Sequence, residues 1–227
     1  MSVNDRQTIS GAAEVVADAD ARAALEAENA LLQFDQVLDL IDMAVRDGQP
    51  FRLRLSTILS LHAEAMRGVH PQAGTLRNAP VEIGGSAHTP PHESLVAVKV
   101  EDLCDWVNRN WAEKSAIELC AYVMWRLNWI HPFADGNGRT TRAVAYLVLC
   151  VRAGVRLPGF PTIPEQIAAD KKPYYDALEE ADKTATNGEA DLTAMVKLLE
   201  HYLQEQLRAV LAAATGTEAD RKGRKFH

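Results

Sequence analysis

The sequence predicts an all-α fold, a helical bundle with little β structure. Apolar residues recur at helical spacing along most of the chain, as in the stripe that runs from Phe34 to Val45. Residues that start and stop helices bound these stretches: Ser115 and Glu118 have the spacing of a capping box, and Gly154 follows an apolar run. Residues 117–130 and 143–151 are apolar on almost every side, so we expect them at the centre of the bundle.

Periodicity and helix-breaking residues divide the chain into elements. We expect helices near residues 12–29, 31–46, 52–66, 95–110, 115–129, 139–153, 174–183 and 191–212. Residues 67–93 contain eight glycines and prolines, which exclude long helices and leave a short strand at Val81–Ile83. We divide the chain into an N-terminal helical segment (1–30), a main domain (31–212) and a polar, basic tail (213–227).

Composition narrows the class of protein. The formal charge of −7 argues against a protein that binds nucleic acid without specificity, and no apolar run reaches the length of a membrane span. The first residues lack the layout of a secretory signal, and the three cysteines lie within apolar patterns without metal-like spacing. We expect buried free thiols and a soluble, cytoplasmic protein, without excluding later export. The oligomeric state stays open, with a homodimer as one alternative.

The segment HPFADGNGRTTR, residues 131–142, joins the two central helices. Gly136-Asn137-Gly138 leads into a helix N-terminus, where two glycines permit positive φ values and backbone N–H groups can face an anion. Arg139 and Arg142 share one face of the first turn, where two cations oppose the helix dipole unless an anion is bound. The segment therefore predicts a polyphosphate site.

Two further side chains add chemistry to this segment. Asp135 offers a hard oxygen ligand of the kind Mg²⁺ prefers, and His131 is the nearby side chain able to take a proton near neutral pH. Each feature alone is more often structural. Their joint occurrence within twelve residues predicts a phosphate site with a metal ligand and a base.

These twelve residues resemble the motif of the Fic (Fido) family, His-Pro-Phe-x-(Asp/Glu)-Gly-Asn-(Gly/Lys)-Arg-x-x-Arg, at every defined position. The wider resemblance covers roughly residues 20–185. It implies a Fic-type helical bundle with a small β-hairpin, the flap, over the active site. It also implies transfer of AMP from ATP to a Ser, Thr or Tyr hydroxyl of a target protein, self-modification included, with neither nucleic acid nor membrane as partner.

The resemblance also implies roles for individual residues. His131 would be the general base, and Asp135 would hold Mg²⁺ (or Mn²⁺) at the α- and β-phosphates. The anion hole would comprise Gly136, Asn137 and Gly138, while Arg139 would contact the β-phosphate and Arg142 the γ-phosphate. The flap residues Ile83, Gly84 and Gly85 would position the target by strand addition. The tyrosines Tyr174 and Tyr175 are candidates for the nucleoside pocket.

Many Fic proteins carry an inhibitory glutamate in a (Ser/Thr)-x-x-x-Glu-(Gly/Asn) pattern. Here Glu28, followed by Asn29, is our candidate to pair with Arg142, although Ala24 replaces the hydroxyl residue. Glu14 is the rival. Gly138 favours nucleotidyl transfer over the phosphate transfer of Doc-type kinases, which have Lys there. Transfer of UMP, GMP, phosphate or phosphocholine, AMP removal and a silent regulatory binding module stay open as alternatives.

Overall fold

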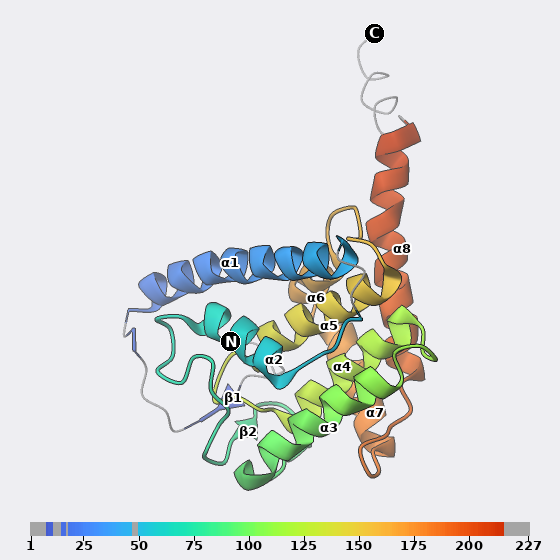
Figure 1. The fold of residues 1–227 in the computed structure, drawn as a ribbon. Helices are drawn as coiled ribbons and strands as arrows, with labels where there is room; N and C mark the ends of the chain where they lie inside the picture. Colours follow the sequence, from blue (N-terminus) through green and yellow to red (C-terminus); the bar gives the residue numbers. More distant parts are fainter. Residues whose placement is uncertain (1–7, 11–14, 17, 47–49, 216–227) are drawn as a thin grey trace.

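The computed structural model describes residues 8–10, 15, 16, 18–46 and 50–215, and these form a helical bundle (Figure 1). The predicted all-α fold is confirmed. In chain order, the elements are β1 (Thr8–Ile9), α1 (Ala19–Arg46), α2 (Leu55–Met66), β2 (Glu82–Ile83), the 3₁₀ helix η1 (Glu93–Leu95), α3 (Val96–Arg109), α4 (Ala116–Ile130), α5 (Asn137–Ala153), α6 (Ile163–Ala169), α7 (Lys172–Thr184) and α8 (Thr193–Thr215).

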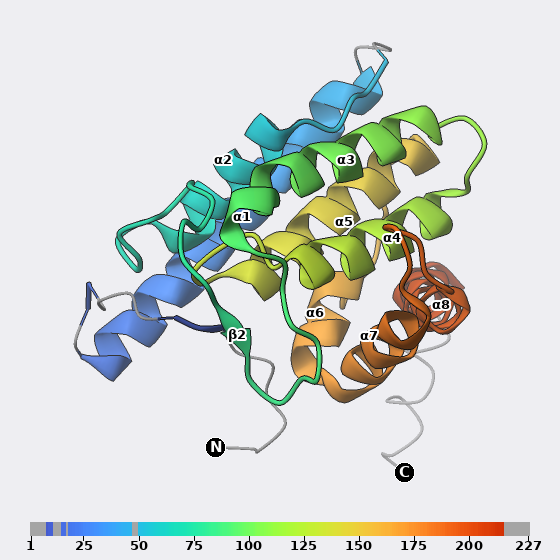
Figure 2. The same ribbon diagram turned by 90° about the horizontal axis from the view of Figure 1, so that it is seen from below.

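The central pair of helices is α4 and α5, which lie side by side within the other helices (Figure 2). Ser115 starts α4 with the predicted capping box: its hydroxyl accepts from the Glu118 N–H at 3.2 Å, and the Glu118 carboxylate accepts from the Ser115 N–H at 2.9 Å. Gly154 ends α5 in the left-handed conformation, with φ 72°. Both predicted central helices are buried over most of their length, so the loop between them has a rigid support.

The N-terminal region differs from the prediction, because α1 is one continuous helix of 28 residues where two were expected. The expected boundary at residues 30 and 31 falls within it. Asn29 does not stop the helix, since its buried side chain donates to the Arg67 carbonyl at 2.8 Å. One turn later, Gln33 donates to the Leu61 carbonyl at 2.8 Å. These two amides fasten α1 along α2. Residues 12–14 of the expected first helix lie outside the described residues.

Two elements were not predicted. Helix α6 has a clear start signal that the periodicity search passed over, a capping box of Thr162 and Glu165 around a first-turn proline. Strand β1 pairs antiparallel with β2, so that Thr8 lies opposite Ile83 and Ile9 opposite Glu82. The second strand of the small sheet therefore comes from the N-terminal segment.

Three further expectations from the sequence concern the cysteines, membrane-spanning helices and the basic tail. All three cysteines are free and buried, as predicted, and burial raises the pKa of the Cys104 thiol to about 12. In the described part of the chain, no helix is both long and apolar enough to cross a membrane. The basic tail falls largely on residues 216–227, outside the described residues.

Candidate active site

His131 ends α4 in the left-handed conformation, with φ 50° and ψ 61°. Residues other than glycine rarely adopt this conformation, which costs about 1–3 kcal/mol and persists where the surroundings enforce it. Two hydrogen bonds hold the residue here: its N–H donates to the Leu127 carbonyl at 2.9 Å, and its carbonyl accepts from Arg77 Nε at 2.8 Å. The side chain is buried.

The His131 ring lies between one backbone carbonyl and one hydroxyl. Nδ1 is 3.4 Å from the Asn128 carbonyl, and Nε2 is 2.8 Å from Oγ1 of Thr8 in β1. Since a carbonyl only accepts, this contact favours the tautomer with the proton on Nδ1, in which Nε2 accepts the hydrogen bond from Thr8. This is the tautomer that a general base requires.

Asn137 sets the direction of the hydroxyl proton. Its amide orientation is fixed by Phe133, because Oδ1 accepts from the Phe133 N–H at 3.0 Å and Nδ2 donates to the Phe133 carbonyl at 2.7 Å. The same Nδ2 donates to Thr8 Oγ1 at 3.1 Å. The Thr8 oxygen therefore accepts from Asn137 and donates its own proton to Nε2 of His131.

Of the two glycines that permit positive φ values, Gly136 has one, with φ 75°, and a Cβ there would lie 2.6 Å from Met66 Sδ. Gly138 does not use this freedom, because α5 already begins at Asn137 and Gly138 is helical. Gly138 matters for space, since a Cβ on it would lie 3.3 Å from Nη1 of Arg142.

The first turn of α5 carries an excess of positive charge. Nη1 of Arg139 is buried and has no hydrogen-bond partner in the described structure. Arg142 is half-buried and forms no ion pair with any described carboxylate, and burial lowers the pKa of its guanidinium. A buried, unpaired donor is costly, so Arg139 at this helix N-terminus favours an anionic ligand, and the positive charge of Arg142 in the same turn adds to that preference.

Helix α1 crosses this positive region with two charged side chains. Arg22 donates to Asp135 Oδ2 at 2.9 Å and to Glu26 Oε1 at 3.0 Å. Glu26 lies 3.6 Å from Nη2 of Arg139, which lies 4.0 Å from Asp135 Oδ1. These four residues form a closed network of alternating charge, which we call the ionic ring. It connects α1 with the loop of residues 131–136, which we call the Fic loop, and with the first turn of α5.

The ionic ring uses Glu26, and the expected pair between Glu28 and Arg142 is not formed. Glu28 is exposed and makes no hydrogen bond or ion pair with any residue that the structure describes. Because α1 is continuous, two residues rotate the side chain by about 200° around the axis, away from the side of Glu26. The rival Glu14 lies outside the described residues.

The strand predicted at Val81–Ile83 is present as β2 and faces β1. Gly84 and Gly85 follow it in a turn, in which Gly85 has φ 66° and the Ser86 N–H donates to the Ile83 carbonyl at 3.2 Å. Ile83 thus lies directly opposite Thr8 in the neighbouring strand, and the Thr8 hydroxyl contacts His131. Strand β1 therefore pairs with β2 on one side and contacts His131 through Thr8, and Figure 1 shows the two strands next to each other.

Comparison with known proteins agrees with this arrangement. Residues 52–149 match the sequence model of the Fic/DOC family. The fold is similar to that of a Fic-domain signalling protein from Bacteroides thetaiotaomicron, with a TM-score of 0.71 over 88% of this chain and 76% of that one, at 23% identity. It also resembles Fic-1 of Caenorhabditis elegans (residues 134–508), with a TM-score of 0.64 over 85% of this chain and 53% of that one, at 24% identity.

The chain is similar to the Fic/DOC family over residues 52–149. It is 28% identical over 195 residues to the protein adenylyltransferase Fic of Drosophila willistoni, and 25% identical over 189 residues to protein adenylyltransferase fic-1 of C. elegans. The alignments cover 84% and 82% of this chain but only 35% and 34% of the relatives. The chain thus spans about a third of the length of the curated relatives.

His62 supports the Fic loop from α2 and was missed by the sequence analysis. Its ring stacks on Phe133 with centroids 3.7 Å apart, its Nε2 donates to the Asp135 carbonyl at 3.0 Å, and its Nδ1 accepts from the Gly74 N–H at 2.9 Å. Burial lowers the pKa of His62 to about 4, so the ring stays neutral. The available signal was a histidine on an otherwise apolar face of α2.

Arg77 is a second supporting residue, to which the sequence gave no role. Its buried guanidinium donates to the His131 carbonyl at 2.8 Å, to the Ala79 carbonyl at 3.1 Å and to the Pro91 carbonyl at 2.5 Å. Its backbone N–H donates to the Pro132 carbonyl at 2.9 Å. Arg77 thereby joins the segment that carries β2 to the Fic loop.

The two tyrosines that are candidates for the nucleoside pocket differ in how far they are buried. Tyr174 is buried, and its hydroxyl lies 2.5 Å from Nδ2 of Asn128, the residue whose carbonyl faces His131. Tyr175 is half-buried and therefore more accessible. Both lie close enough to Arg142 to influence the pKa of its guanidinium.

The residues around Asp135 fit a metal held jointly by the protein and a phosphate ligand. Across the described ranges, no group of three or more His, Cys, Asp or Glu could hold a metal alone. Mg²⁺ commonly takes one or two carboxylates and completes its shell with phosphates and water. Asp135 offers one such carboxylate, with Oδ1 accepting from the Gly136 N–H at 2.6 Å and Oδ2 engaged by Arg22.

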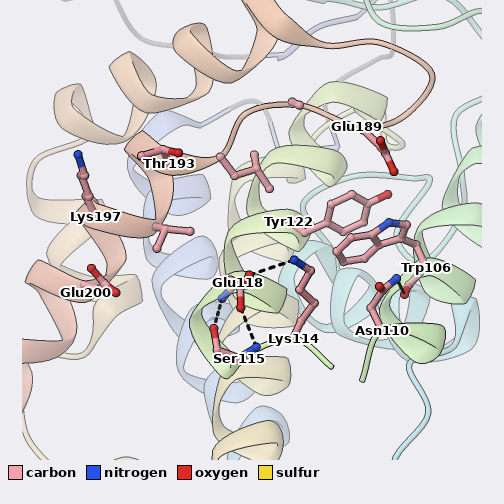
Figure 3. Close-up of a pocket in the computed structure, with 13 residues that line it drawn as sticks. Trp106, Asn110, Lys114, Ser115, Glu118, Tyr122, Glu189, Thr193, Lys197 and Glu200 are labelled. Carbon is pink, nitrogen blue, oxygen red and sulfur yellow. Dashed lines mark hydrogen bonds and ion pairs between the residues drawn. The ribbon is translucent and has the colours of Figure 1, made fainter. Parts of the chain in front are cut away.

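A cavity of about 780 Å³ lies at the opposite end of α4, near its capping box (Figure 3). Two of its charged groups pair with each other: Lys114 donates to Glu118 at 3.1 Å, and hydrogen bonds from Ser115 are the main cause that lowers the pKa of Glu118 to about 2. The Trp106 and Tyr122 rings stack at 3.6 Å between centroids. This cavity is distinct from the Fic loop.

The Gly136 turn allows a test with a matched control. Gly136→Ala and Gly154→Ala each place an alanine at nearly the same positive φ, which costs about 1–2 kcal/mol. Only the Gly136 Cβ meets a neighbour, Met66 Sδ at 2.6 Å, whereas nothing lies within 4 Å of the Gly154 Cβ. We expect the free energy of unfolding, measured in urea, to fall clearly further for Gly136→Ala. Equal losses would contradict the packing described for this turn.

Proposed function

We propose that this chain is a protein adenylyltransferase, which transfers AMP from ATP to a Ser, Thr or Tyr hydroxyl of a target protein. One observation carries the proposal: a hydroxyl lies 2.8 Å from the accepting nitrogen of His131. It does so beside the N-terminus of α5, where Arg139 has a buried, unpaired donor. A base, a nucleophile and a polyphosphate site thus share one place. The names of the curated relatives support the same activity.

In this proposal, Nε2 of His131 accepts the target hydroxyl's proton as its oxygen bonds to the α-phosphorus of ATP. The bond from that phosphorus to the bridging oxygen breaks, and pyrophosphate leaves. Arg139, Arg142 and the N-terminus of α5 bind the β- and γ-phosphates and balance the charge of the leaving group. Asn137 orients the hydroxyl, as it orients Thr8 in the structure.

Asp135 would hold Mg²⁺ or Mn²⁺ against the phosphates, where the ion neutralises negative charge. Arg22 binds the same carboxylate at 2.9 Å, so it must leave before a cation can take that oxygen. Asp135→Ala should consequently remove most of the metal-dependent activity.

The residue at position 138 supports transfer of a nucleotidyl group. Because residue 138 is a glycine, it does not crowd Arg142, whereas a Cβ at this position would lie 3.3 Å from Nη1 of Arg142. We assign the nucleoside to the side of Tyr175, since Tyr174 is committed to Asn128. The β2 edge at Ile83, followed by Gly84 and Gly85, would pair with an extended target segment.

Helix α1 would keep the enzyme at rest through the ionic ring. Glu26 competes with phosphate for Arg139, and Arg22 competes with the metal for Asp135. Ions that are partly desolvated in this way interact more strongly than ordinary surface pairs, yet a triphosphate offers Arg139 a better partner. Glu26 thereby takes the inhibitory role that the sequence assigned to Glu28.

The nucleotide and the base can be tested together. Full-length protein is incubated with ATP, CTP, GTP or UTP, each labelled on the α-phosphate, and with candidate target proteins. We expect label from ATP, and a loss of about 10²–10⁴-fold in transfer rate for His131→Ala with little change in ATP binding. Preference for another nucleotide would select one of the alternative transferases. Near-wild-type transfer by His131→Ala would remove His131 as the base.

Inhibition is tested by the same substitution at two positions of α1. Glu26→Ala opens the ionic ring and should raise AMP transfer by about tenfold or more, equivalent to roughly 1.4 kcal/mol. Glu28→Ala is the matched control and should leave the rate unchanged, because Glu28 is exposed and contacts none of the described residues. Alanine maintains helix propensity at both positions. If only Glu28→Ala raised the rate of AMP transfer, Glu28 would be the inhibitory residue, as the sequence predicted, and Glu26 would not.

A further inference from the structure

The N-terminal strand β1 occupies the edge of β2 that a target segment would use. Thr8 pairs with Ile83 and Ile9 with Glu82 in antiparallel register, the backbone pattern of strand addition. Figure 1 shows β1 beside β2. The chain thus presents one of its own segments to its own flap.

The register places a hydroxyl residue at the base. Successive strand residues face opposite sides, so Thr8 faces the catalytic loop while the neighbouring Ile9 is 57% exposed. The Thr8 hydroxyl donates to His131 Nε2 at 2.8 Å and accepts from Asn137 Nδ2 at 3.1 Å. The described contacts of this hydroxyl are both with residues of the Fic motif.

We propose that Thr8 is a modification site of this enzyme, adenylylated in cis by the active site of the same chain. The inference rests on the proposed adenylyltransferase function. Thr8 Oγ1 bonds to the α-phosphorus of ATP, and its proton passes to Nε2 of His131. The bond from the α-phosphorus to the oxygen bridging to the β-phosphate breaks, and that oxygen departs with the electron pair as part of pyrophosphate. Thr8 is left as a phosphodiester of AMP.

Covalent connection favours reaction within one chain. Only residues 10–18 separate β1 from α1, and α1 is fastened to α2 by Asn29 and Gln33. A segment tethered by so few residues has an effective concentration in the millimolar range, above that of most free targets. The ionic ring sits on the nucleotide side of the same loop, so Glu26→Ala should speed the modification of Thr8.

The test uses full-length wild-type and Glu26→Ala protein with MgATP, followed by intact mass measurement and peptide mapping. We expect one AMP per chain, mapped to Thr8. Thr8→Val retains the shape and β propensity but removes the hydroxyl, and it should abolish this adduct. Thr8→Ser should retain it, and Ser10→Ala should leave it unchanged. The first-order rate constant should not vary with protein concentration.

Four results would overturn the inference. An adduct that maps elsewhere and persists in Thr8→Val would remove Thr8 as the site, while a rate constant that rises with protein concentration would replace reaction in cis by reaction between chains. Candidate target proteins are added to the same reaction, so that failure of the inference can be distinguished from failure of the proposed function. Label on those proteins without label on Thr8 overturns the inference alone. No label on any protein, with Glu26→Ala included, removes the proposed function and the inference together.

Discussion

The site depends on one constraint, the reversal of the chain between two buried helices. Residues 131–136 join α4 to α5, so their backbone groups must be satisfied inside the protein. Arg77 binds the carbonyl of His131, and His62 binds that of Asp135. With both ends of the turn held, His131 and Gly136 retain left-handed conformations that would be unfavourable in a free loop. The fold therefore preorganises His131 and the start of α5 for the roles that we propose for them.

The same rigidity leaves positive charge unmatched at the start of α5, and α1 supplies the counter-charge. Arg139 and Asp135 cannot both meet a bound nucleotide and remain in the ionic ring. Exchanging one anionic partner of the half-buried Arg139 for another costs less than leaving its guanidinium without a partner. In the proposed enzyme, the resting state and the nucleotide-bound state would satisfy the same charges with different partners.

The sequence predicted the parts of the site that are local in the chain. The capping box at Ser115 and the motif from His131 to Arg142 are short patterns whose chemistry depends on near neighbours. It did not consider Glu26, whose contact with Arg139 depends on the phase of the continuous helix α1. It also failed for Thr8, whose partner strand is far away in sequence. His62 looked like an ordinary core histidine because its partners come from two distant loops.

The central claim is that Glu26 and the triphosphate of ATP compete for Arg139. The direct measurement is the affinity for MgATP, by calorimetry, of the wild type, Glu26→Ala, Arg139→Ala and the double variant, arranged as a double-mutant cycle. We predict that Glu26→Ala binds MgATP more tightly and that this gain disappears when Arg139 is also replaced. An equal gain with and without Arg139 would show that the two side chains act independently, and would contradict the account.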